Sequence, residues 1–372
     1  MNNVHGIIYA YHNFPALNPL GNRRTGASMP FCSRYRLIDF ALSSLMNAGI
    51  HDVGVIMQRD YQSLLDHIGN GRTWDMSKIA KGRGMRILPP FGLPSSHKGV
   101  YEGCMEALNA VSQYISDIKQ EYVILIRGDM CASIDIAKVI EQHIESGVDI
   151  TAVCSDIVPE NVHHRFVPGE GVLADKLLCR VNNGEQGVAA LEVYVMKTKM
   201  LQALINWCSE NNKMHFHRDA LPHLMENGAK VGIYMHNGYS RIIISVHDYF
   251  QASMAMLDAE KRSQIFDEER KVATKTRSDV STYYGDDAKV VNSLIGDGCI
   301  IEGTVENCVI FRGAKVGKKA HLKNCIVLQD GVIEENVVLN HVICDKNVVV
   351  SEYVTLTGNE KLPLVVPKDT VI

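Results

Sequence analysis

The residues of this chain that could take part in chemistry are few and lie far apart. Asp129 follows a predicted strand, Tyr122–Ile126, and its position predicts a solvated carboxylate at the end of that strand. His163-His164 and His215-Phe216-His217 have no carboxylate or cysteine at metal-ligand spacing, which predicts histidines on a loop or a helix surface.

A second segment, Tyr11-His12-Asn13-Phe14, follows the predicted strand Gly6–Tyr9. Its side chains are bulky and include no cation.

An alternation of strands and helices over residues 1–257 would position both Asp129 and the segment from Tyr11 to Phe14. The predicted strands are Gly6–Tyr9, Val53–Met57, Tyr122–Ile126, Asp149–Cys154 and Leu191–Met196, and amphipathic helical patterns cover residues 37–46, 64–68 and 105–115. This alternation predicts an α/β fold with a mostly parallel sheet and helices on both faces. Ligands bind at the carboxyl ends of the strands in such sheets.

The pattern changes after residue 257. Residues 258–287 are highly charged and predict a linker that is partly helical. Residues 288–372 contain a repeat whose units begin at Val305, Leu322 and Leu339, 17 residues apart. Small or branched apolar residues recur every five or six positions, which predicts a β-helix; an ordinary sandwich of short strands is the alternative.

Composition excludes several classes of protein. The 372 residues have a formal net charge of −4, and no apolar run is long enough to span a bilayer, so we expect neither nucleic acid nor membrane as a partner. The ten cysteines include no C-x-x-C pair, which is typical of free thiols in a reducing compartment. The N-terminal residues do not resemble a secretion signal. We therefore expect a cytoplasmic protein.

The segment from Pro30 to Ser43, P-F-C-S-R-Y-R-L-I-D-F-A-L-S, resembles P-F-G-G-K-Y-R-I-I-D-F-A-L-S in ADP-glucose pyrophosphorylases (glucose-1-phosphate adenylyltransferases). Further similar segments are Asn47–Ile50, Gly103–Ala107, Arg127–Asp129 (A-G-D in the family) and Arg218–Pro222. The resemblance implies a nucleotidyltransferase-like (Rossmann-like) sheet domain followed by a left-handed β-helix of hexapeptide repeats. It also implies Mg²⁺ chemistry on ATP and glucose-1-phosphate.

Departures from the family pattern concentrate at the nucleotide site. Tyr11, His12 and Phe14 replace the three glycines of the family's A-G-G-x-G loop. Ala16 replaces its arginine, and Gly26 replaces the lysine of a following K-P pair. Arginine and lysine there would neutralise charge on the α-phosphate and the pyrophosphate. Phosphate-binding loops are rich in glycine because their backbone N–H groups must converge on the phosphate without an intervening Cβ. The resemblance therefore implies a filled, inactive loop with no intact catalytic residues at these positions, and a different kind of nucleotide cradle is the alternative.

The metal and sugar-phosphate positions depart as well. Ile242 replaces the second metal-binding aspartate, which leaves Asp129 as a weak, single carboxylate. Gly103 is kept, but Glu102 stands in place of a glutamine and Glu192 introduces an acid into the family's S-M-G-I-Y segment. Negative charge facing a phosphate has the wrong sign. The family's E-K-P motif has no counterpart around residues 178–183.

This combination resembles the GlgD-type subunits of bacterial glycogen synthesis, which accompany a catalytic GlgC-type pyrophosphorylase in a hetero-oligomer. The resemblance implies a non-catalytic, modulating subunit with no cofactor of its own and Mg²⁺ only for the partner's reaction, or a homo-oligomer when alone. One alternative is an active but slow nucleotidyltransferase. Another is a sugar-phosphate or anion sensor using Arg34, Arg36 and Lys98. A third is an acyltransferase β-helix using His321 or His341.

Overall fold

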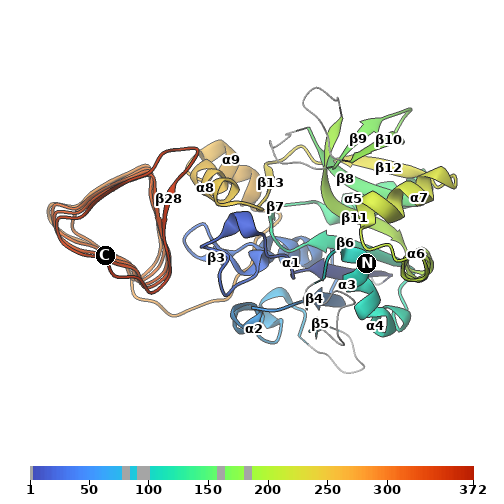
Figure 1. The fold of residues 1–372 in the computed structure, drawn as a ribbon, viewed down its shortest axis with the longest axis horizontal. Coiled ribbons are helices and arrows are strands. Elements are labelled where there is room, and N and C mark those ends of the chain that lie inside the picture. Colours follow the sequence, from blue (N-terminus) through green and yellow to red (C-terminus); the bar gives the residue numbers. More distant parts are fainter. Residues whose placement is uncertain (1–2, 78–83, 90–100, 157–163, 180–186) are drawn as a thin grey trace.

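The computed structural model describes the chain except for residues 1–2, 78–83, 90–100, 157–163 and 180–186. Two parts lie side by side, an N-terminal α/β domain and a stack of coils that appears as a triangle when viewed end-on (Figure 1). Helices α8 and α9 lie between them.

The centre of the N-terminal domain is a nine-stranded sheet with the order β10-β9-β11-β6-β1-β4-β5, in which β8 pairs with β11 and β12 with β8. Strands β5, β4, β1 and β6 are parallel, as expected, and β11 runs antiparallel to both β6 and β8, so the whole sheet is mixed. Its strands are β1 (Val4–Tyr9), β4 (Val53–Ile56), β5 (Met85–Leu88), β6 (Tyr122–Arg127), β8 (Ile150–Ser155), β9 (His164–Pro168), β10 (Ala174–Cys179), β11 (Val188–Lys197) and β12 (Val231–Met235).

Helices cover both faces of this sheet and enclose two apolar cores. One core packs α1 and α5 against the sheet, and the other packs α3, α4 and α6 against the opposite face. The stretch 105–115, expected as one helix, is divided at Val111, whose φ of −113° and ψ of 20° interrupt the helix. The helices are α1 (Ile38–Asn47), α2 (Gln62–Ile68), α3 (Cys104–Ala110), α4 (Ser112–Ser116), α5 (Ile136–Ser146), α6 (Thr198–Glu210), α7 (Leu221–Glu226), α8 (Val246–Ala255) and α9 (Ala259–Ile265).

Short elements complete the domain near the strand ends. They are the 3₁₀ turns η1 (Pro15–Leu17), η2 (Gly26–Ser28) and η3 (Arg72–Trp74), the π-helical turn η4 (Phe216–Ala220), and two ribbons, β2 (Pro30–Phe31) with β3 (Tyr35–Arg36) and β7 (Met130–Ala132) with β13 (Ser240–Ile242).

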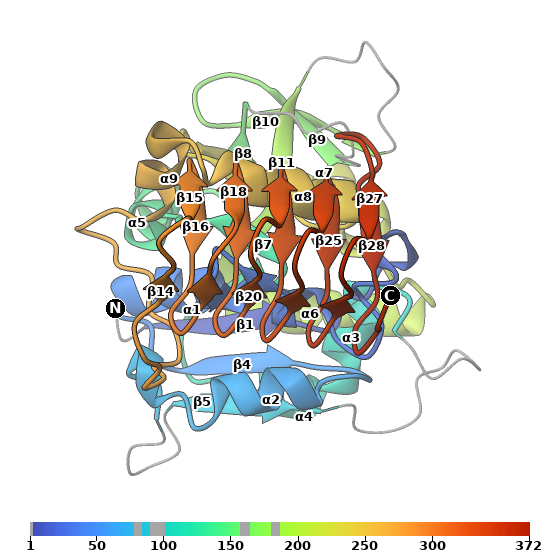
Figure 2. The same ribbon diagram turned by 90° about the vertical axis from the view of Figure 1, so that its left-hand side faces the viewer.

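The C-terminal part is a β-helix of three parallel sheets, seen from the side in Figure 2. The sheets are β14 (Tyr283–Tyr284), β17 (Ile300–Ile301), β20 (Lys315–Val316), β23 (Val332–Ile333) and β26 (Val349–Val350); β15 (Lys289–Val291), β18 (Thr304–Glu306), β21 (His321–Lys323), β24 (Val338–Asn340) and β27 (Thr355–Thr357); and β16 (Leu294–Ile295), β19 (Val309–Ile310), β22 (Ile326–Val327), β25 (Val342–Cys344) and β28 (Leu364–Val366). Val305 pairs with Leu322 and Leu322 with Leu339, so the 17-residue repeat is one coil.

The segment expected as a linker is helical at α9 and then contacts the N-terminal domain again. The backbone N–H of Ala273 donates to the Ser43 hydroxyl, and the Trp74 indole donates to the Ala273 carbonyl. Strand β14 also lies within the 258–287 range and pairs with β17.

A shared apolar core joins the two parts. Val309, Ile326 and Ile343 of one β-helix sheet are fully buried in a cluster that also contains Phe250 of α8. His341 packs beside the Phe250 ring with 6.0 Å between ring centroids. This histidine is part of the junction, not a solvent-facing corner residue as expected. The contact fixes one face of the β-helix against α8.

All ten cysteines are free thiols, as expected. Cys308 and Cys325 stack as buried residues of the β-helix core. None of the helices in the described parts of the chain is long and apolar enough to cross a membrane.

Candidate functional site

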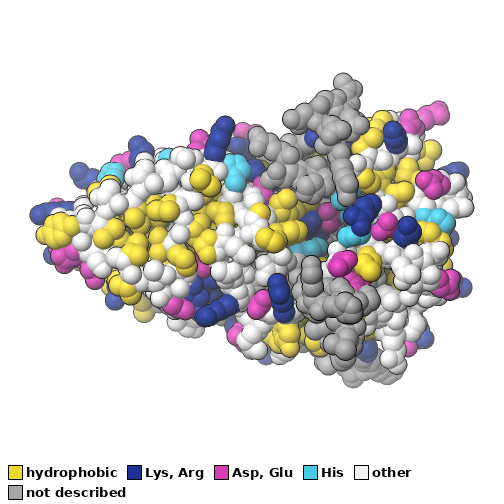
Figure 3. Space-filling view, in the orientation of Figure 1, with side chains coloured by type: hydrophobic (Ala, Val, Ile, Leu, Met, Phe, Trp, Pro, Cys, Tyr) yellow, Lys and Arg dark blue, Asp and Glu magenta, His cyan; other side chains and the backbone are white. Residues whose placement is uncertain are grey.

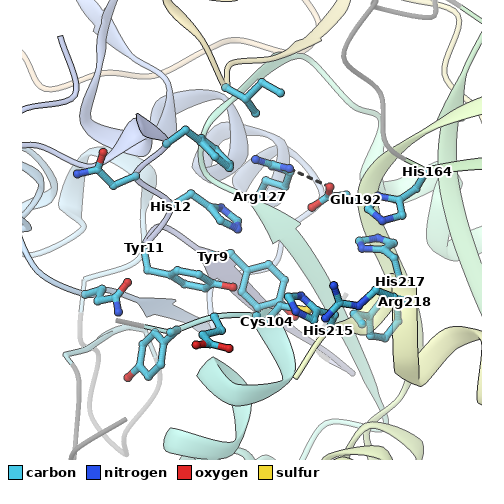
Figure 4. Close-up of a pocket in the computed structure, with 18 of the residues that line it drawn as sticks. Tyr9, Tyr11, His12, Cys104, Arg127, His164, Glu192, His215, His217 and Arg218 are labelled. Carbon is cyan, nitrogen blue, oxygen red and sulfur yellow. Dashed lines mark ion pairs between the residues drawn. The ribbon is translucent and has the colours of Figure 1, made fainter. Parts of the chain in front are cut away.

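A cavity of about 720 Å³ opens at the carboxyl ends of β1 and β6, where the sheet type predicts ligand binding. Histidine and charged side chains gather around this hollow in the N-terminal domain (Figure 3). Figure 4 shows its two walls, with the loop after β1 on one side and residues of β9, β11 and η4 on the other.

Aromatic side chains fill the loop after β1. Tyr11 is 5% exposed and lies edge-on to Tyr9 and to Tyr101, with ring centroids 6.0 and 5.5 Å apart. His12 stacks on Phe14 at 5.5 Å. Each position at which the family's phosphate loop has a glycine carries a ring side chain here. These side chains therefore lie where a phosphate would have to approach the backbone N–H groups.

Behind this loop, Arg127 forms the buried electrostatic centre of the cavity. Its Nε and Nη2 donate to the two carboxylate oxygens of Asp129 at 2.8 and 2.9 Å, and its Nη1 lies 2.9 Å from Oε1 of Glu192. The guanidinium also lies 5.8 Å from the centroid of the Phe14 ring. One cation therefore neutralises two carboxylates and packs against the aromatic loop.

Asp129 is only 1% exposed, so its expected solvated position is wrong. Burial by itself would raise the pKa of this carboxyl, but the Arg127 guanidinium and His12 outweigh burial and hold it well below its usual range. For Glu192 the same competition between burial and Arg127, helped by nearby histidines, lowers the pKa to about 2. Both groups are ionised at neutral pH.

The remaining nucleotide-site positions surround this pair. Ile242 of β13 pairs with Met130 of β7, so the strands bring it beside Asp129 as the family pattern implies. Gly26 packs so closely that a Cβ there would lie 3.1 Å from the Cβ of Asp129. Ala16 is exposed and lines the cavity. Position 26 therefore supplies no cation, and the cation that contacts Asp129 is Arg127.

The family implies Mg²⁺ at Asp129, but the residues present do not fit it. Mg²⁺ requires oxygen ligands in a near-octahedral arrangement. Both oxygens of Asp129 already accept hydrogen bonds from Arg127, and Ile242 offers no ligand atom.

Glu102 and Gly103 lie at the start of α3 on the cavity wall. Gly103 has a steric reason to be glycine, because a Cβ there would lie 2.0 Å from the carbonyl oxygen of Met214. Glu102 is exposed, and its backbone N–H donates to Glu106. Residues 180–183, which belong to the range without an E-K-P motif, lie outside the described residues. Lys98 lies outside them as well.

Two of the histidines expected on a loop or a helix surface are placed differently, and His163 lies outside the described residues. His217 is buried in η4 and His164 lies in β9; their rings stack with centroids 4.1 Å apart. Glu192 of β11 lies beside both. Linear spacing could not have indicated this cluster, because its members come from three separate elements that meet only in the folded chain.

Arg127 is the functional residue that sequence reasoning missed. In the sequence Arg127 appears only within a three-residue match to the family's A-G-D. Glu192 appears only as an acid of the wrong sign for a phosphate site. The register of β6 and β11 pairs Leu125 with Tyr194, and continuing it brings Arg127 and Glu192 to the same end of the sheet. Two departures of opposite charge on neighbouring strands were the available signal.

A second, basic cleft lies at the junction of the two parts. It is lined by cations from the N-terminal domain, the linker and the β-helix, namely Arg34, Arg36, Lys275, Arg277, Arg312 and Lys346. Next to it, Nη2 of Arg24 lies 2.8 Å from both oxygens of Asp345, and both side chains are buried. Burial and the neighbouring Arg36 and Arg24 guanidinium groups lower the pKa of Lys346 to about 7.

Comparison with known proteins agrees with this architecture. Residues 16–259 match the nucleotidyl transferase family, and residues 277–362 match the GlmU-like C-terminal hexapeptide family. The expected nucleotidyltransferase-like sheet and left-handed β-helix of hexapeptide repeats are thereby confirmed. The first match begins directly after the aromatic loop.

The more specific similarity is to glucose-1-phosphate adenylyltransferases. The protein of that name from Pseudothermotoga lettingae is 30% identical over 86% of this chain and 76% of its own length. Those from Bacillus cereus and Clostridium perfringens are each 28% identical, over 90% and 93% of this chain and 90% and 88% of their own lengths. The chain belongs to the nucleotidyl transferase family and, within it, to the glucose-1-phosphate adenylyltransferases.

Proposed function

We propose that this chain is a catalytically impaired subunit of a glucose-1-phosphate adenylyltransferase that modulates a GlgC-type catalytic partner in a cytoplasmic hetero-oligomer. The reaction assigned to the assembly is ATP plus glucose-1-phosphate to ADP-glucose plus diphosphate, in support of glycogen synthesis. Mg²⁺ belongs to the partner's active site in this proposal, and the present chain needs no cofactor for its part in that reaction.

The observation that carries the proposal is the Arg127–Asp129 pair beneath the aromatic loop. An active site of this reaction must neutralise the triphosphate with a metal ion and positive side chains. Here the one carboxylate kept from the family pattern is bound by an arginine, and Tyr11, His12 and Phe14 occupy the loop. Losing one preorganised electrostatic group costs on the order of 10²–10³ in rate. Several such groups are replaced here.

An intact fold around a dismantled site favours a role in assembly. Both apolar cores and the packed junction are complete, so the chain can present a stable surface to a partner. The expected alternative of a slow enzyme would require the aromatic loop to accept triphosphate while Arg127 released Asp129.

The test is diphosphate release from ATP and glucose-1-phosphate with Mg²⁺, measured for this protein alone, for the GlgC-type partner alone and for the two mixed. We expect background rates alone and a changed rate or effector response in the mixture, together with co-elution in size-exclusion chromatography. Turnover by this chain alone at an ordinary enzymatic rate would refute the impaired site. Unchanged partner kinetics without co-elution would refute the modulating role.

A second candidate function, an anion sensor, is favoured by the basic cleft at the junction. Arg34 and Arg36 are candidate anion contacts in the sensor alternative, and they lie in one cleft with Lys275, Arg312 and Lys346. A clustered set of cations with a lysine of lowered pKa attracts a phosphate or sugar phosphate, because the anion relieves their mutual repulsion. This role is compatible with the modulating role, since the cleft joins the two parts of the chain.

Inorganic phosphate and glucose-1-phosphate are suitable probes for this cleft. We expect either to raise the melting temperature, and Arg36→Gln and Lys346→Gln to reduce the rise more than Lys138→Gln, a matched exposed cation on α5 outside the cleft. An equal response from all three variants would assign the effect to general ionic strength and remove the sensor function.

A further inference from the structure

The cavity wall opposite the aromatic loop brings two histidines and a glutamate together (Figure 4). His164, Glu192 and His217 each offer one ligand atom, and these atoms all lie within 4.8 Å of one another. We propose that these three side chains bind a divalent transition-metal ion of the Zn²⁺ type, whose remaining coordination positions face the cavity.

The donor set selects the class of metal. Two imidazole nitrogens and one carboxylate form a ligand set of zinc sites that keep an open position. Imidazole also suits other first-row transition metals, whereas Mg²⁺ and Ca²⁺ prefer oxygen ligands. The proposed ion therefore differs in kind from the Mg²⁺ implied at Asp129, and the site lies on the opposite cavity wall.

The three ligand groups are close enough to share one ion. The rings of His164 and His217 stack with centroids 4.1 Å apart, and the Glu192 carboxylate lies beside them.

Neighbouring groups orient two of the three ligands. The Tyr194 hydroxyl lies 2.6 Å from Nε2 of His217, so Nδ1 is the ring nitrogen that this arrangement offers to a metal. Arg127 pairs with Oε1 of Glu192, so Oε2 is the carboxylate oxygen to offer. Partners that hold the far side of each ligand are typical of metal sites, because they fix the tautomer and the orientation of the ligand.

The backbone at Glu192 is also unusual. The φ angle of Glu192 is +55°, a left-handed conformation that residues other than glycine adopt at an energetic cost. The pairing of β11 with β8 also shifts register at this point. The resulting bulge accounts for the position of the Glu192 carboxylate among the two histidines. Bulges often redirect a side chain near functional sites.

The experiment uses the full-length chain after chelator treatment and removal of the chelator. Zn²⁺ is titrated by calorimetry, and Co²⁺ is added separately as an optical probe. We expect one Zn²⁺ per chain, and Co²⁺ absorption bands typical of nitrogen and oxygen ligands, without a thiolate charge-transfer band. Mg²⁺ at the same concentration should give no comparable heat.

Matched variants separate the cluster from the rest of the cavity. Glu192→Gln and His217→Ala should each weaken Zn²⁺ binding by more than about 100-fold, and Tyr194→Phe by about 10- to 100-fold. Glu102→Gln and His215→Ala, which remove the same groups elsewhere in the cavity, should change it by less than about threefold.

Two results would overturn the site. One is Zn²⁺ affinity that is unchanged in both Glu192→Gln and His217→Ala while circular dichroism shows them folded. The other is loss of binding in Cys179→Ser together with a thiolate band for Co²⁺, which would assign the metal to cysteine. Neither result depends on adenylyltransferase activity, so the site and the proposed function can fail separately.

Discussion

The cavity and the domain junction each contain a buried arginine that binds an aspartate, yet their charge balance differs. In the cavity, Arg127 holds Asp129 with two parallel hydrogen bonds and also binds Glu192. At the junction, a single nitrogen of Arg24 contacts both oxygens of Asp345, and its Nη1 is buried without a hydrogen-bond partner in the described part of the chain.

The surroundings increase this contrast. The cavity arginine has two carboxylates, so the group has an excess of negative charge. The junction aspartate has several cations around it, including Lys346, so that region has an excess of positive charge. From this contrast we expect an anion such as a phosphate to be disfavoured where the family pattern places the nucleotide and to be favoured near the junction.

Removing Arg127 tests the cavity half of this comparison and should have the largest effect. Arg127→Leu leaves Asp129 and Glu192 buried without their cation, which should lower the free energy of unfolding by at least about 3–5 kcal/mol at pH 7. Urea unfolding followed by circular dichroism measures it.

The pH dependence gives this variant its control. In the wild type the lowered pKa values of the two carboxyls contribute stability that is full above about pH 5 and is lost as pH falls toward 2. Arg127→Leu removes the main group that lowers both pKa values, and burial raises them, so the loss should shrink as pH falls from 7 to 4. A loss independent of pH would contradict the charge explanation.

The two aspartates can be compared directly. Asp345→Asn leaves Arg24 as a buried charge at the junction and should cost about 3–5 kcal/mol. Asp129→Asn leaves Arg127 paired with Glu192, so it should cost only about 1–3 kcal/mol. Urea unfolding of both variants under one condition makes the comparison, and an equal or larger cost for Asp129→Asn would show that Glu192 does not compensate.

Lys346 sharpens the junction half of the comparison. Its pKa is lowered to about 7, against an ordinary value near 10.4, so the unfolded chain binds more protons there and stability falls as pH drops from about 10 to 7. Lys346→Met should reduce this slope and add stability at pH 7, on the order of 1.4 kcal/mol for each unit by which the pKa is lowered. Melting temperatures at pH 7, 8 and 9 for the variant and the wild type measure it, with Lys138→Met as control. Parallel profiles for wild type and Lys346→Met would contradict it.

Ile242→Asp should have the smallest effect. It restores the second family carboxylate beside Met130, but Arg127 still holds both oxygens of Asp129 and Gly26 still supplies no cation. Diphosphate release from ATP and glucose-1-phosphate should stay at the level of Ile242→Asn, the uncharged control. An increase of about tenfold or more over that control would mean that the aromatic loop accepts the nucleotide.

Local pattern alone determined much of this protein. The 17-residue repeat predicted the β-helix because each coil needs the same apolar positions, and the strand–helix alternation predicted the α/β domain. The rings of Tyr11 and Phe14 predicted a filled loop, because a large side chain occupies space next to the backbone whatever the fold. Residue type and spacing suffice for these features.

Tertiary structure alone decided the electrostatics. Asp129 looked solvated in the sequence and is buried, because Arg127 and the ends of neighbouring strands enclose it. Glu192 becomes a partner of Arg127, and of two histidines, only through the pairing of β6, β9 and β11. Arg24 and Asp345 are 321 positions apart. Charges interact through space, so their partners depend on which elements the fold brings together and not on their order along the chain.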